Sequence, residues 1–90
     1  MEDNTTLVEA VYLHNSSEKN TICCIEEMSE LTKVLTKKLR QSEKFNIESL
    51  TEELAHVLLL CDVLIKEHEI NRCDILAEQE SAVNRMYRED

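Results

Sequence analysis

The stretch that decides the fold runs from Glu48 to Ile70 and reads ESLTEELAHVLLLCDVLIKEHEI. After Leu54 it is apolar nearly all round a helix, with Asp62 as the one charged residue before Lys66. A helix of this kind must be covered on more than one side. We therefore expect it to pack against a second helix of the chain and against another subunit.

The remainder of the chain is also typical of helices. Its 90 residues include no Gly and no Pro, so nothing interrupts a helix and little favours strands. No stretch resembles a linker, which predicts a single domain over residues 1–90. Asn15, Asn46 and Asn71 are expected to cap helix starts. The sequence thus predicts an all-α fold of four helices: Thr6 to His14, Ser16 to Arg40, Ile47 to Glu69, and Arg72 to Arg88.

The two long helices are expected to form an antiparallel hairpin. The segment RQSEKFN, residues 40–46, is the one convincing break between them, and a turn there brings them side by side. The first long helix has an apolar stripe at spacings of three and four residues, made of Ile22, Ile25, Met28, Leu31, Leu35 and Leu39. Because so short a chain buries a modest core, we expect a four-helix bundle-like subunit assembled as a homodimer or homotetramer.

Charge and composition exclude several classes of partner. The net charge of −9 argues against binding a nucleic-acid backbone, which needs clustered Lys and Arg. The four cysteines form no C-x-x-C pair and have apolar neighbours, which predicts free, buried thiols. No signal peptide is visible, and the apolar run VLLLCDVLI, residues 57–65, is about half as long as a membrane span. We expect a soluble, cytoplasmic protein without a membrane partner.

Two short segments repeat one pattern, EEMSEL at residues 26–31 and EELAHV at residues 52–57. In the expected hairpin the two segments are level within roughly one helical turn. Carboxylates grouped beside apolar residues repel one another unless a cation lies between them. Mg²⁺ takes oxygen ligands of this kind and keeps positions for phosphate oxygens. The pattern predicts a divalent-metal site that receives a di- or triphosphate; the alternative is a pair of solvated acidic surfaces, which is ordinary for Glu.

The segment CIEEMSELTKVLTK, residues 24–37, followed by the stretch from Glu48 to Ile70, resembles the all-α nucleoside triphosphate pyrophosphohydrolases of the MazG-like superfamily. That family has E-E-x-x-E on one helix and E-x-x-D on the next. The resemblance implies a Mg²⁺-dependent helical dimer or dimer of dimers that cleaves a nucleoside triphosphate to a monophosphate and pyrophosphate. It assigns metal ligation to Glu27, Glu30 and Glu53, and it places His56 where the family has Asp.

The resemblance also implies roles for neighbouring residues. Glu26, beside Glu27, is the candidate for orienting the attacking water. Asn84 and Arg85 on the last helix are candidates for binding phosphate, with Lys33 and Lys37 as alternatives. Imidazole at position 56 suits Mn²⁺, Fe²⁺ or Zn²⁺ better than Mg²⁺.

His56 leaves three outcomes open for this site. The enzyme has an altered metal preference, Glu26 or Glu52 compensates, or the fold persists as a non-catalytic binding or regulatory module. A fourth, different interpretation is a di-metal carboxylate bundle, because Glu53-x-x-His56 is the E-x-x-H element of such proteins. That interpretation requires a second E-x-x-H from a symmetry-related subunit.

Overall fold

The computed structural model describes residues 3–88, and these form an all-helical chain. The elements are α1 (Thr5–His14), α2 (Ser17–Arg40), the short 3₁₀ helix η1 (Ser42–Lys44), α3 (Ile47–Glu67) and α4 (Arg72–Tyr87). No strand occurs in this range, which confirms the all-α class. Within the same residues, no helix combines the length and apolarity that crossing a membrane requires.

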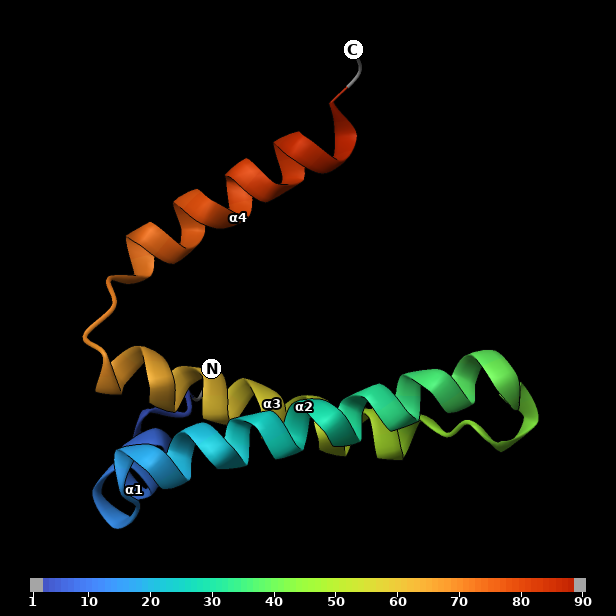
Figure 1. Cartoon of the computed structure of the whole chain (residues 1–90), viewed down its shortest axis with the longest axis horizontal. Coiled ribbons are helices and arrows are strands. Elements are labelled where there is room, and N and C mark those ends of the chain that lie inside the picture. The colour runs from blue at the N-terminus through green and yellow to red at the C-terminus, as the bar shows by residue number, and fades with distance from the viewer. Residues whose placement is uncertain (1–2, 89–90) are drawn as a thin grey trace.

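The centre of the molecule is the predicted hairpin, in which α2 and α3 lie side by side and η1 closes the turn (Figure 1). We call the η1 end of the hairpin its tip and the opposite end its base. At the base, α1 packs against α3. Two polar contacts hold it there: Glu9 Oε2 lies 2.8 Å from Lys66 Nζ, and Asn4 donates to Asp62 at 2.7 Å.

Two helix starts follow the predicted capping. Asn46 accepts a hydrogen bond from the backbone amide of Ser49 at 2.7 Å, and α3 begins directly after it. Asn71 accepts from the amide of Cys73 at 2.8 Å at the start of α4. Each side chain takes up an amide that has no partner within its helix. Local capping therefore fixes where these two helices begin.

The predicted cap of α2 was wrong by one residue. Ser16, rather than Asn15, accepts from the backbone amide of Lys19, at 3.1 Å. Asn15 instead donates its side-chain amide to Asn20 Oδ1 at 3.1 Å. Two adjacent residues are able to cap α2, and in the structure Ser16 does so while Asn15 bonds to Asn20.

The end of α3 also differs from the prediction, because the helix stops at Glu67 instead of Glu69. Glu69 has φ of 52°, the left-handed conformation that usually ends a helix at Gly. The amide of Ile70 then bonds back to the carbonyl of Ile65 at 3.0 Å. The chain turns there, and α4 runs away from the hairpin with none of its residues buried (Figure 1).

The core of the described chain is small. The residues that are buried are Val8, Asn20, Cys24, Leu60 and Val63. Many large apolar side chains stay exposed on the long helices, among them Ile25, Leu39 and Leu58. A single copy therefore leaves much apolar surface in contact with water.

The cysteines do not share one environment. Cys24 is buried, Cys23 and Cys61 are partly buried, and Cys73 is exposed. The prediction of buried thiols was thus correct for Cys24 and wrong for Cys73, which lies on the unpacked helix α4. Burial and the neighbouring Cys61 raise the pKa of the Cys24 thiol, so its reactive thiolate form is disfavoured.

Candidate metal centre

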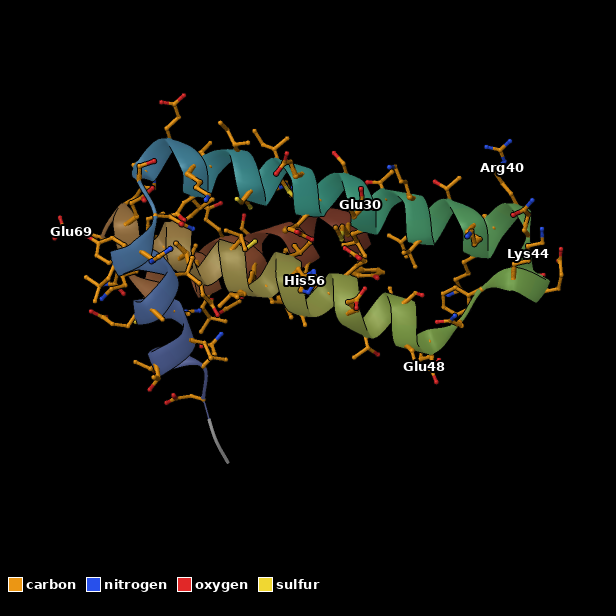
Figure 2. All side chains as sticks on the ribbon, turned by 90° about the horizontal axis from the view of Figure 1, so that it is seen from below. Glu30, Arg40, Lys44, Glu48, His56 and Glu69 are labelled. Carbon is orange, nitrogen blue, oxygen red and sulfur yellow. The ribbon has the colours of Figure 1, made fainter. Side chains whose placement is uncertain are left out.

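The hairpin brings Glu27 of α2 together with Glu53 and His56 of α3. One ligand atom from each side chain lies within 4.8 Å of the others. We call these three residues the carboxylate–imidazole cluster. Figure 2 labels His56 on α3 and Glu30 on the facing helix α2, midway between the two ends of the hairpin. Glu53 and His56 share a face of α3 because they are three residues apart.

The two carboxylates of the cluster have different surroundings. His56 Nδ1 lies 3.1 Å from Glu27 Oε2, which is hydrogen-bonding distance, and 4.0 Å from Glu53 Oε2, which is too long. The Glu53 side chain is only 14% exposed, whereas that of His56 is 46% exposed. Glu53 Oε2 itself is buried and has no hydrogen-bond partner among the described residues. Glu53 Oε2 is therefore a hydrogen-bond acceptor that has no donor and lies within the cluster.

The charges within the cluster are unbalanced. Burial, followed by the charge of Glu27, raises the pKa of the Glu53 carboxyl, and His56 opposes this to a smaller extent. Removing a carboxylate from water beside a second carboxylate is unfavourable unless a positive charge compensates. The cluster is thus an environment that favours a cation or a proton.

The donor atoms suit a single divalent ion. Ligands about 2.1 Å from a shared ion lie about 3.0–4.2 Å apart, so modest side-chain rotation would bring donors now within 4.8 Å to coordinating distance. Two carboxylates and one imidazole are typical ligands of Mn²⁺, Fe²⁺ and Zn²⁺, and they suit Mg²⁺ less well. Glu27, Glu53 and His56 therefore fit a transition-metal ion best.

Two other acids predicted for this site lie outside the cluster. Glu30 is 51% exposed, and its Oε1 lies 3.3 Å from Lys33 Nζ, one turn along the same helix. Glu26 is exposed. The structure thus brings Glu27, Glu53 and His56 together and does not bring Glu30 or Glu26 to them.

The predicted phosphate contacts occupy two separate places. Asn84 and Arg85 are exposed on α4, where Arg85 donates to Ser81 at 2.8 Å. They are not brought to the cluster. Lys33 and Lys37 instead line a surface hollow of about 270 Å³ that begins at Glu30, one turn from Glu27.

This hollow, which we call the basic hollow, contains residues that sequence reasoning missed. Its lining also includes Lys44, Phe45, Asn46 and Ser49. The available signal was charge clustering, because residues 33–44 hold five of the ten Lys and Arg of the chain and only one acid. The acidic protein therefore has a basic tip, and Figure 2 shows Arg40 and Lys44 there.

Comparison with known proteins gives no relative for this chain: no protein-family model, no curated protein and no solved structure matches it. The MazG-like resemblance therefore depends on the two acidic motifs and their placement on paired helices.

Proposed function

We propose that the chain binds a divalent cation through Glu27, Glu53 and His56 and hydrolyses a nucleoside triphosphate to a monophosphate and pyrophosphate. The observation that supports cation binding most directly is the buried, partnerless Oε2 of Glu53. The motif order, E-E-x-x-E followed by E-x-x-H, supports the choice of reaction. The proposed active unit is a homodimer or homotetramer.

Each residue of the cluster would contribute one ligand atom to the cation. Glu53 contributes its partnerless oxygen, and Glu27 can contribute the carboxylate oxygen that does not contact His56. His56 offers a nitrogen in its neutral form. A divalent ion held there supplies polarisation of the phosphoryl group and a more acidic bound water.

The basic hollow is the proposed binding place for the polyphosphate. Lys33 and Lys37 lie six and ten residues after Glu27, or about 9 and 15 Å along the helix. A triphosphate that starts at the cluster reaches these ammonium groups when it extends toward the tip. Their charge compensates the anionic ligand where the rest of the protein is acidic. Glu26 is exposed and lies outside the cluster, so it has no role in this proposal.

A second candidate is a metal-binding module without catalysis. It is favoured by the position of Asn84 and Arg85, which are exposed on a helix that runs away from the hairpin. It is also favoured by His56, which lacks the charge of a carboxylate. In this candidate the ion stabilises the hairpin and no substrate is turned over.

The test measures cation binding and pyrophosphate release on one preparation. Calorimetry with Mn²⁺, Zn²⁺ and Mg²⁺ should show the tightest binding for a transition metal and at least about tenfold weaker binding in Glu53→Gln. Glu78→Gln, an equivalent change on exposed α4, should bind as the wild type does. Release of pyrophosphate from a nucleotide panel supports the enzyme; binding without release supports the module. Equal cation affinity in Glu53→Gln and wild type would contradict both.

A further inference from the structure

Two polar contacts fix how α2 and α3 are aligned between the base of the hairpin and the carboxylate–imidazole cluster. Asn20 of α2 donates to Glu67 of α3 at 3.2 Å, and Glu27 of α2 lies 3.1 Å from His56 of α3. Because the helices are antiparallel, positions between 20 and 27 face positions between 67 and 56. Interpolation places position 24 opposite position 61, and both positions hold cysteine.

The thiols of Cys24 and Cys61 are in contact between the two helices. Cys24 is 3% exposed and Cys61 is partly buried, and the neighbouring core residues of α3 are Leu60 and Val63. Burial, followed by the charge and the hydrogen bond of Cys61, raises the pKa of the Cys24 thiol, which requires the two sulfur atoms to be close. The alignment of the helices and the interaction of the thiols therefore agree.

The spacing of packed helices suits a disulfide at this place. A disulfide requires Cα atoms about 4.4–6.8 Å apart. The axes of packed helices lie about 8–10 Å apart, and the Cα atoms lie about 2.3 Å from each axis, so Cα atoms that face each other directly are about 3.4–5.4 Å apart. The two ranges overlap. Rotation of the two side chains, without movement of the helices, can therefore bring the sulfur atoms to bonding distance.

We propose that Cys24 and Cys61 form a reversible disulfide between α2 and α3 by exchange with a small-molecule disulfide such as oxidised glutathione. The Cys61 sulfur, which is the more exposed, attacks one glutathione sulfur, the S–S bond breaks, and one glutathione leaves with the Cys61 proton. Cys24 then attacks the Cys61 sulfur of the mixed disulfide, and the second glutathione leaves with the Cys24 proton. Two protein thiols are oxidised, and one glutathione disulfide is reduced to two thiols.

The bond closes a loop that contains the whole candidate site. Residues 25–60 lie between the two cysteines, and they include Glu27, Glu53, His56 and the basic hollow. A cross-link of this kind stabilises a fold chiefly by restricting the unfolded chain, so the oxidised hairpin should resist unfolding. The proposal does not depend on a cation or a substrate, because neither thiol belongs to the cluster.

Exchange with a mixture of reduced and oxidised glutathione tests this bond in the full chain. After equilibration, free thiols are alkylated and the tryptic peptides are analysed by mass spectrometry without reductant. We expect the peptide of residues 20–33 to be linked to the peptide of residues 45–66. The ratio of linked to free thiols should be at least about tenfold higher in buffer than in concentrated urea, because the fold holds the thiols together. Equal ratios, or no such link in buffer, would overturn the proposal.

The adjacent Cys23 provides a matched control, because it belongs to the same peptide as Cys24. Cys23 is partly buried and lies about 100° round the helix from Cys24. Cys23→Ala should keep the link, and Cys24→Ala should lose it. If Cys24→Ala does not fold, a link retained in Cys23→Ala still identifies Cys24 as the partner of Cys61. A link kept in Cys24→Ala and lost in Cys23→Ala would assign the bond to Cys23 and refute the proposal.

Discussion

At the scale of single residues, the proposed cation site depends on one carboxylate. Glu53 is mostly buried, faces Glu27, and keeps an oxygen without a donor. A glutamate on the surface would be solvated, and its charge would not lower the stability of the folded protein. The buried charge of Glu53 should therefore lower the free energy of unfolding of the cation-free protein, and this effect can be measured.

Neutralising Glu53 should stabilise the cation-free protein at pH 7. Burial and Glu27 raise the pKa of Glu53 in the folded state above its value of 4.5 in an unfolded chain, so the folded state binds the proton more tightly. Stability from this group is thus gained as pH falls through the folded pKa and lost as pH rises through it. Urea unfolding of Glu53→Gln should give a higher midpoint than wild type at pH 7, with the difference shrinking toward pH 4. A lower midpoint at pH 7 would contradict this account.

Added cation should make wild type more stable than Glu53→Gln, which is the reverse of the order expected without cation. Bound Mn²⁺ stabilises only the folded state, by about 2.7 kcal/mol at one hundred times its dissociation constant. Wild type should therefore gain stability while Glu53→Gln gains much less. The thermal midpoint with and without chelator measures this difference.

Replacing His56 by Asp should change the metal preference. A third carboxylate adds an oxygen ligand and a negative charge, and both favour Mg²⁺. We expect His56→Asp to bind Mg²⁺ at least about tenfold more tightly than wild type and, if the protein is an enzyme, to gain Mg²⁺-dependent pyrophosphate release. Calorimetry with Mg²⁺ and Zn²⁺ on both proteins provides the comparison. Unchanged Mg²⁺ affinity would show that position 56 is not a ligand.

At the scale of helices and turns, local capping sets the boundaries and one residue is strained. Glu69 ends the α3 segment with φ of 52°, which is unfavourable for any residue with a Cβ atom. The chain has no glycine to place there. The junction between α3 and α4 thus carries a conformational cost, and the turn brings Arg72 Nη2 to 2.8 Å from Asp62 Oδ1.

Glu69→Gly should therefore increase stability by about 0.5–1 kcal/mol, since glycine adopts this conformation without a steric penalty. Glu69→Ala removes the same side chain and keeps the Cβ atom, so it should give no gain. Urea unfolding of both variants against wild type separates the backbone effect from the loss of charge.

The helices were predictable from sequence because their signals are local. The absence of Gly and Pro, together with Asn46 and Asn71 as caps, predicted the starts of α3 and α4 correctly. The end of α3 was not predictable in the same way, because nothing in the sequence marks Glu69 as left-handed. Pattern placed Glu27, Glu53 and His56 opposite one another, since helical period and hairpin length determine that. The pattern also placed Glu30 in the site, whereas the structure pairs it with Lys33, three residues further along α2.

At the scale of the whole molecule, the hairpin with α1 is one packed unit and α4 is an appendage. None of the residues of α4 is buried, and Figure 1 shows it leaving the base of the hairpin. The direction of a helix depends on the residues that it packs against in the folded protein. Sequence patterns could therefore predict that α4 is a helix, but not where it lies. The predicted four-helix bundle-like subunit is therefore not confirmed, because α1, α2 and α3 pack together and α4 lies outside this packing.

Removal of residues 72–90 should leave the hairpin folded and able to bind cation. Because α4 contributes no buried residue, the thermal midpoint of a chain ending at Asn71 should stay within about 3 °C of wild type. Cation affinity should also be unchanged. If substrate turnover is lost while cation binding remains, Asn84 or Arg85 takes part in binding phosphate. A large fall in the thermal midpoint would show that α4 stabilises the hairpin.

Asn20 has a consequence for the cluster, although it lies two turns away from it. This amide is fully buried at the base, donating to Glu67 of α3 at 3.2 Å and accepting from Asn15. The leucines between the long helices would tolerate a longitudinal slide, because one apolar layer resembles the next. A slide of one turn, about 5.4 Å, would separate Asn20 from Glu67 and strand a polar group in the interior. A single asparagine thus selects the alignment in which Glu27 stands level with Glu53 and His56.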